Sequence, residues 1–304
     1  MKQKSLTPIY IILTLSMLFW GMSFVFTADL LPVLDPISIV FARLVISSAL
    51  LWASALLFFR KQKLTKSLLK WIFLLAVFEP FIYFLGETFG LQRVSPTVVS
   101  LIIATIPVFT AIVMSVFFQT KLSAINFFGI FISLFGVFCM IINKDLTLDA
   151  DLIGLVLVFV AVFSAVGYGV ILNKLSKNIH PVWLIAIQNT FGVLLFLPLF
   201  FLLGKTPDYE AGNALFPFLS VKETMWFYII VLAVFCSTLA FLFYILAVRR
   251  IGIAKSNVFS NLIPIFTAII SYFLLDEKFT PLKIAGIIIV IFGLVLTQKK
   301  INEK

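Results

Sequence analysis

Long apolar runs separated by short polar breaks dominate the chain. Most runs hold about 18 to 25 residues, which at about 1.5 Å rise per residue lets a helix cross a hydrocarbon core of about 30 Å. Strands of a membrane barrel would instead alternate polar and apolar residues. The pattern predicts an all-α polytopic membrane protein with ten transmembrane helices, at residues 8–29, 37–59, 69–91, 95–118, 124–142, 152–173, 182–203, 225–248, 254–275 and 281–298.

Composition agrees with a membrane environment. Of 304 residues, 62% are hydrophobic, 12% are charged and 36 are Phe, whereas soluble domains are about 25% charged. The net charge of +10 would fit a nucleic-acid partner only if the basic residues formed a patch or groove, and they are scattered over short loops. We therefore expect the lipid bilayer as the surroundings and no nucleic-acid partner.

The loop charges predict an orientation. With ten spans both termini share a face, which collects sixteen Lys and Arg residues and one acid, Glu303, while the other face has six basic residues and ten acids. Cytoplasmic loops carry the Lys and Arg excess in membrane proteins. Both termini are therefore expected in the cytoplasm.

An internal repeat divides the chain. Residues 107–113 (PVFTAIV) match residues 264–270 (PIFTAII) at an offset of 157. The same offset pairs Arg93 with Arg250, and it pairs glycines that suit close helix packing, Gly129 with Gly286 and Gly136 with Gly293. Each half holds five helices, and an odd number forces the halves into opposite orientations, an arrangement common in secondary transporters. The expected units are two inverted five-helix repeats, 1–148 and 149–304.

Several stretches carry a family resemblance. They are LFWGMSF in the first helix, FARLVISSALL in the second, the paired Pro107 and Pro264 segments, and LLDEKFTPLKIAGIIIVIFGLVL near the end. Because these stretches occur in this order and the proline segments are duplicated in the two repeats, the chain resembles the EamA-type transporters of the drug/metabolite transporter superfamily over nearly its whole length. The resemblance implies a ten-helix carrier, usually of the bacterial inner membrane, that moves small metabolites, often outward, through a cavity between its halves.

Two carboxylates interrupt the third apolar run. In residues 78–90, FEPFIYFLGETFG, Glu79, Tyr83 and Glu87 are spaced i, i+4 and i+8, so on a helix they form one stripe about 12 Å long. A charged side chain at mid-membrane costs at least about 2.5 to 3.5 kcal/mol and normally faces a bundle interior or a wet cavity. Pro80 and Gly86 also favour a local bend beside Glu79.

The two acids have different expected roles. No basic residue lies at the depth of Glu79, which favours a protonatable or substrate-amine-binding group, with a neutral buried acid as the alternative. Glu87 lies near the outer end of its helix, where Arg43 lies at a matching depth. An outer-side ion pair of Arg43 and Glu87 is therefore expected, and it has either a structural or a functional role.

A second polar stripe lies in the ninth span. Asn257, Ser260, Asn261 and Pro264 follow i, i+3, i+4 and i+7. These groups either bind substrate or join helices, since interhelical polar bonds contribute about 0.6 kcal/mol on average. Pro264 and its counterpart Pro107 predict paired helix interruptions, the usual pointer to a transporter site.

Aromatic and amide residues complete the candidate site. Trp20, Tyr168 and Tyr244 either wall the cavity or serve as packing residues and interfacial anchors. Gln188 and Asn189 form a further polar pair in the seventh span, and the pattern does not determine which way they face.

No constellation for catalysis is present in the sequence. His180 is the single histidine, Cys139 and Cys236 lie in different spans, and GxSxG, HExxH and phosphate-binding glycine motifs are missing. An enzyme acting on a lipid carrier would need clustered loop acids or histidines. We expect no catalytic residue, cofactor or metal, and energy from a gradient or a partner subunit rather than from bound ATP.

The sequence therefore favours a secondary transporter, with export as the expected direction, for a small polar or amphipathic metabolite. It would work by alternating access around a midplane cavity in the bacterial cytoplasmic membrane, with proton coupling as one option. A passive facilitator of the same substrates is the alternative. The substrate, the coupling ion and the oligomeric state are not determined by the sequence.

Overall fold

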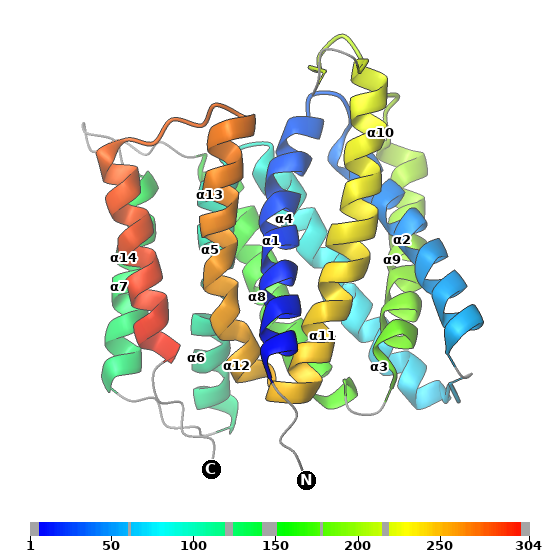
Figure 1. The fold of residues 1–304 in the computed structure, drawn as a ribbon, viewed down its shortest axis with the longest axis horizontal. Coiled ribbons are helices and arrows are strands. Elements are labelled where there is room, and N and C mark those ends of the chain that lie inside the picture. The colour runs from blue at the N-terminus through cyan, green and yellow to red at the C-terminus, as the bar shows by residue number, and fades with distance from the viewer. Residues whose placement is uncertain are drawn as a thin grey trace.

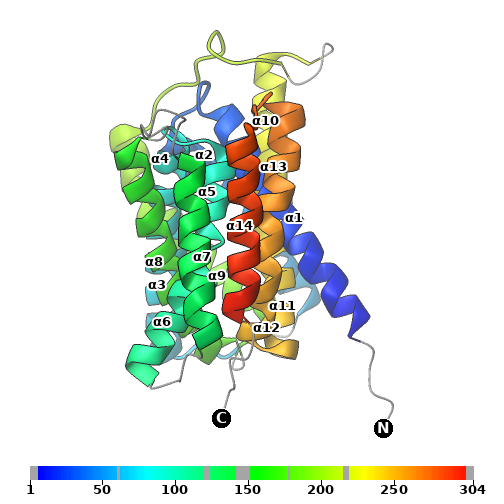
Figure 2. The same cartoon turned by 90° about the vertical axis from the view of Figure 1, so that its left-hand side faces the viewer.

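The computed structural model describes residues 6–59, 62–118, 124–141, 151–176, 179–214 and 219–298. Regular structure in these ranges is helical, and the helices stand side by side (Figure 1). Helix α1 (Thr7–Leu30) begins and α14 (Pro281–Gln298) ends at the same end of the molecule, as both views show (Figures 1 and 2). This end is called the terminal end below.

Apolar helices long enough to cross a membrane account for most of the described chain. Three further helices are apolar but shorter: Pro96–Thr110, Phe128–Cys139 and Pro281–Leu296. The prediction of an all-α membrane protein with several spanning helices is confirmed. The seven segments of spanning length are Thr7–Leu30, Pro36–Phe58, Lys66–Leu91, Leu152–Leu175, Pro181–Leu203, Val221–Ile251 and Lys255–Leu274.

Besides α1, three of these segments are single uninterrupted helices, namely α2 (Pro36–Phe58), α8 (Leu152–Leu175) and α9 (Pro181–Leu203). Local chemistry fixes where two of them begin. The Asp35 carboxylate accepts the N–H groups of Ile37 and Ser38 at 3.0 and 3.1 Å, and Asp151 accepts the N–H of Gly154 at 3.0 Å. Such caps satisfy backbone donors that have no partner inside the helix.

Two spans that the sequence predicts as single helices each contain a wide π-type segment. The first consists of α3 (Lys66–Ala76), η1 (Val77–Ile82) and α4 (Tyr83–Leu91), and the second of α10 (Val221–Val231), η2 (Leu232–Leu239) and α11 (Ala240–Ile251). In η1 the backbone of Glu79 is extended, with φ −143° and ψ 119°. Pro80, which has no N–H to donate, follows at this point.

Two other predicted spans are divided just before their prolines. Residues 95–118 become α5 (Pro96–Ile103) and α6 (Ile106–Phe118), and residues 254–275 become α12 (Ile253–Val258), the 3-10 turn η3 (Phe259–Leu262) and α13 (Ile263–Leu274). Pro107 and Pro264 are each the second residue of the helix after the break. Proline is tolerated there because the first turn needs no N–H donor.

Glycines set the closest helix contacts. Helices α7 (Ala124–Ile141) and α14 pack side by side at one edge (Figures 1 and 2), and a Cβ at Gly136 would lie 2.6 Å from the backbone nitrogen of Val290. A Cβ at Gly86 in α4 would lie 2.5 Å from the carbonyl oxygen of Leu157 in α8. Gly86 therefore permits close packing on α8, and the local bend lies at Glu79, where it was expected.

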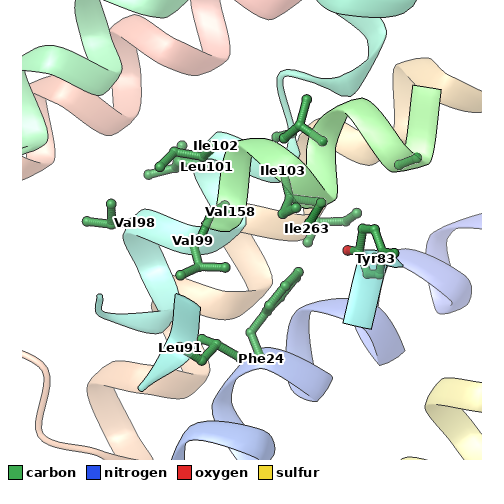
Figure 3. Packing of buried hydrophobic residues seen from close by; sticks show 14 of the residues in the cluster. Phe24, Tyr83, Leu91, Val98, Val99, Leu101, Ile102, Ile103, Val158 and Ile263 are labelled. Atoms are coloured by element: carbon green, nitrogen blue, oxygen red, sulfur yellow. The ribbon is translucent and has the colours of Figure 1, made fainter. Parts of the chain in front are cut away.

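A buried apolar cluster joins helices from both halves of the sequence. Phe24 in α1, Leu91 in α4, Val99 in α5, Val158 in α8 and Ile263 in α13 belong to it (Figure 3). Lipid tails are as apolar as these side chains, so close van der Waals packing, rather than exclusion from water, holds the helices together. Part of this cluster lines the cavity described next.

Candidate functional site

A cavity lies between α1, α2, α4, α8, α11 and the broken segments around them. It comprises about 850 Å³ of space free of protein atoms, part of which is open to the outside. Ten of the candidate residues named from the sequence line it: Trp20, Arg43, Glu79, Tyr83, Glu87, Pro107, Tyr168, Tyr244, Asn257 and Ser260.

Two candidates are not in the cavity wall. Asn261, 6% exposed, and Pro264 are buried next to it. They follow Ser260, which does line the cavity, because the chain turns through η3 into α13 at this point. The stripe expected from helical spacing is therefore divided by the 3-10 turn.

The break at Glu79 is held by neighbouring helices. Because the backbone leaves the helical path here, the carbonyls of Phe78 and Glu79 need other donors. The Ser164 hydroxyl in α8 donates to the Phe78 carbonyl at 2.6 Å, and the Gln188 amide in α9 donates to the Glu79 carbonyl at 2.9 Å. The Glu79 side chain is 8% exposed and lines the cavity.

Ser164 was missed by sequence reasoning, and the facing of Gln188 was left undetermined. A serine in an apolar helix is common, so only the tertiary contact identifies its role. The offset of Gln188 from Glu79 in the sequence, 109 residues, gives no local signal either.

Arg43 is almost fully buried in α2, with 1% of its surface exposed. Its Nε donates to the Ser237 hydroxyl at 2.8 Å, and its guanidinium carbon lies 4.5 Å from the centre of the Phe84 ring. Its Nη1 is buried and has no hydrogen-bond partner. Ser237 was not named from the sequence, because it lies 194 residues further along the chain.

The expected ion pair between Arg43 and Glu87 is not formed. Arg93 and Asp151, in contrast, do form an ion pair, with their N and O atoms 2.9 Å apart. Arg43 is turned toward Ser237 and Phe84 instead, and Glu87, 3% exposed, keeps its Oε1 buried without a partner. Both residues line one cavity, but the expected direct pair was wrong.

Aromatic residues and an amide form another part of the wall. The Tyr244 hydroxyl donates to the Asn257 side-chain oxygen at 2.5 Å, and the Ser260 hydroxyl donates to the Asn257 carbonyl at 2.7 Å. The Trp20 and Tyr244 rings lie 5.2 Å apart between centroids. These contacts join α1, α11 and α12, so this part of the stripe contributes to packing as well as to the cavity surface.

The second π-type segment differs chemically from the first. Cys236, at an offset of 157 from Glu79, donates from its thiol to the Phe19 carbonyl at 3.0 Å. Ser16 in α1 donates to the Ala240 carbonyl at 2.8 Å, and Thr238 donates to the Ala233 carbonyl at 2.8 Å. This segment is therefore tied to α1 and contains no carboxylate.

A polar seam connects α2, α9 and η2 beside the cavity. The Asn189 amide donates to the Ser47 hydroxyl at 2.9 Å, and Ser47 and Thr238 share a hydrogen bond of 2.7 Å. Trp52 donates to Thr190 at 2.8 Å. Neighbouring Gln188 and Asn189 thus have separate roles, one at the Glu79 break and one in the seam.

Comparison with known proteins agrees with a chain of apolar membrane helices. The model of the EamA-like transporter family matches residues 7–142 and 152–298. The chain belongs to this family. An uncharacterized transporter from Archaeoglobus fulgidus is 27% identical over 299 residues, covering 97% of this chain and 98% of its own.

Further relatives and a solved structure extend the comparison. The uncharacterized transporter YetK from Bacillus subtilis is 25% identical over 224 residues, which cover 72% of this chain and 65% of YetK. A solved crystal structure matches the fold with a TM-score of 0.63 over 96% of both chains at 12% identity. Membership of the EamA-like transporter family, together with relatives named as transporters, supports a membrane transporter.

Proposed function

We propose that this protein is a secondary transporter that exports a small polar or amphipathic metabolite by alternating access. Its ten spans would form two inverted five-helix halves, residues 1–148 and 149–304, that rock around the cavity. The boundary at 148 lies outside the described residues. Paired π-type segments support the proposal, because η1 (Val77–Ile82) and η2 (Leu232–Leu239) overlap at the repeat offset of 157.

The proposed location is the bacterial cytoplasmic membrane with both termini in the cytoplasm. The excess of Lys and Arg on the face that carries the termini supports this orientation. In this arrangement the terminal end of the molecule faces the cytoplasm, and the Arg93–Asp151 pair lies outside.

The observation that carries the proposed function is the position of Glu79. A carboxylate on an interrupted helix, inside a cavity lined from both halves, is the arrangement expected of a substrate or coupling-ion site. Glu79 would bind a proton or a cationic group of the substrate. Tyr83, Asn257 and Ser260 in the same wall would supply further polar contacts.

The experiment is thermal stabilisation of the purified protein by amino acids, nucleosides, sugar phosphates and organic cations at two pH values. Wild type is compared with Glu79→Gln, and with Glu210→Gln as a control on an exposed loop. A ligand that is lost in Glu79→Gln and kept in Glu210→Gln supports a substrate at this carboxylate. A ligand that survives Glu79→Gln assigns Glu79 to protons or structure instead.

Active accumulation separates the transporter from a passive facilitator. Coupled transport predicts uptake of the stabilising ligand against its gradient into liposomes that hold the wild-type protein. A facilitator, in which Glu79 supplies polarity alone, would equilibrate the ligand and never concentrate it.

A further inference from the structure

Arg43 has the geometry of a prepared binding group. Its guanidinium is fixed in orientation by two neighbours, the Ser237 hydroxyl at Nε and the Phe84 ring against its face. The remaining Nη1 edge is buried and unpartnered, and the residue lines the cavity. Arginine carries five N–H donors in a planar fork, so much of its hydrogen-bonding capacity at Nη1 is unused here.

A buried guanidinium edge without a partner is costly, because the charge has lost its hydration. Lipid offers no compensating group, and in the described part of the chain no carboxylate lies within 4.0 Å of Arg43. A polar molecule that enters the cavity can supply a partner for this edge. Carboxylate and phosphate groups match the planar fork of arginine and accept two parallel hydrogen bonds from it.

We propose that Arg43 binds an oxyanion of the transported solute, a carboxylate or a phosphate group. This inference rests on the proposed function, since it names a chemical feature of the substrate that the cavity carries.

Glu87 indicates a second chemical feature of the same ligand, a hydrogen-bond donor. Its Oε1 is buried, unpartnered and in the same cavity wall as Arg43, although the two side chains do not pair. A carboxylate accepts hydrogen bonds, so a donor on the solute would satisfy it. Arg43 and Glu87 thus provide an anion-binding and a donor-binding point in one cavity, and Ser237 acts as the positioning residue for Arg43.

The test uses matched probes that differ in one group. Because aromatic rings line the cavity, the probes share a phenyl body: 3-phenylpropionate against 3-phenylpropionamide, and phenyl phosphate against phenol. Binding to the full-length protein in detergent is measured by calorimetry at millimolar probe concentrations. The amide and phenol arms remove the oxyanion, and the two oxyanion arms distinguish a carboxylate from a phosphate ligand.

The variants isolate Arg43. Wild type is expected to bind at least one oxyanion probe more tightly than its neutral partner. Arg43→Gln should weaken that binding about tenfold to a hundredfold, the range for lost hydrogen bonds to a charged group. Arg43→Lys should lose less, and Ser237→Ala should show a smaller loss. Arg93→Gln, which removes an exposed arginine outside the cavity, is the control and should bind like wild type.

Several results would overturn the inference. One is unchanged oxyanion affinity in Arg43→Gln, and another is the failure of both oxyanion probes to bind wild type at millimolar concentration. Retained binding of the neutral probe by Arg43→Gln shows that the cavity is still folded. If Arg43→Gln keeps full oxyanion affinity while Glu79-dependent ligands are still transported, only this inference fails. If no ligand is transported by wild type, the proposed function fails.

Discussion

At the residue scale, two side chains from neighbouring helices determine how Glu79 is presented. Ser164 and Gln188 bind the carbonyls that the broken backbone exposes at Phe78 and Glu79. These bonds fix an extended residue inside a helical span, where unpaired carbonyls would otherwise face an apolar surrounding. The carboxylate position therefore depends on residues that need not touch the substrate.

Removing either bond should destabilise the protein. We expect Gln188→Met and Ser164→Ala each to cost about 1 to 3 kcal/mol, because each leaves a buried carbonyl without a donor. Thermal unfolding in detergent measures this, with Gln92→Met at an exposed position as the control. Equal melting temperatures for Gln188→Met and Gln92→Met would show that the Glu79 break does not need Gln188.

His180 should make stability depend on pH. Partial burial, and secondarily the positive charge of Arg249, lower the pKa of the His180 imidazole. The folded state then favours neutral His180, so its contribution is fully present above the unfolded pKa of about 6.5 and is lost as the pH falls below it. We expect His180→Asn to reduce the loss of melting temperature between neutral and mildly acidic pH. A variant with the wild-type pH profile would contradict this.

The sequence could predict which polar residues belong to the site, because charged and amide groups in an apolar span must face inward. It could not predict their partners. Arg43 contacts Ser237 and Gln188 contacts Glu79 across long sequence separations, and side-chain direction there is set by packing. The expected Arg43–Glu87 pair failed for this reason.

At the element scale, close approach of α4 and α8 positions Glu87 and the Glu79 break. A Cβ at Gly86 would meet the Leu157 carbonyl at 2.5 Å and the Ala161 nitrogen at 2.9 Å. Both obstacles are backbone atoms, so an added methyl group must push the helices apart. The small residue is therefore required by packing between the two helices.

Gly86→Ala should destabilise the protein by about 1 to 3 kcal/mol, the usual cost of overpacking. Gly169→Ala is the matched control, since its Cβ would meet nothing nearer than 3.6 Å, from the Ile253 side chain. The control should be neutral or slightly stabilising, because Ala favours helix over Gly. Melting temperatures of the two variants decide the matter, and equal values would contradict the packing explanation.

Helix breaks show what hydropathy leaves out. The sequence predicts continuous spans at 95–118 and 254–275, and the structure divides both just before Pro107 and Pro264. Hydropathy measures how apolar the side chains are, whereas a helix break depends on hydrogen-bond partners that other helices supply to the exposed backbone groups. The paired prolines indicated where to look, and the repeat made that signal stronger than either proline alone.

At the scale of the whole molecule, the repeat and the loop charges together determine the proposed architecture. The first described helix, α1, begins and the last, α14, ends at the same end of the molecule (Figure 1). This agrees with an even number of membrane crossings. The sequence supports ten spans through its offset of 157 and its charge asymmetry. The shape of the cavity between the halves could not be derived from the sequence, because it depends on how the broken helices pack.

Thiol labelling tests this architecture in cells. In a background with Cys139→Ala and Cys236→Ser, we expect Lys205→Cys to react with a membrane-impermeant reagent from outside. Lys63→Cys should react only after the cells are opened, because the two loops lie on opposite faces in the ten-span arrangement. Labelling of both positions from the same side would contradict the proposed topology.

The central proposal is that the cavity around Glu79 carries the transported solute, with Glu79 binding a proton or a cationic group of that solute. The most direct measurement is uptake of the best stabilising ligand into proteoliposomes, with and without a proton gradient, for wild type, Glu79→Gln and Glu210→Gln. The account predicts gradient-driven accumulation by wild type and Glu210→Gln, and only exchange of ligand by Glu79→Gln. Undiminished accumulation by Glu79→Gln would contradict it.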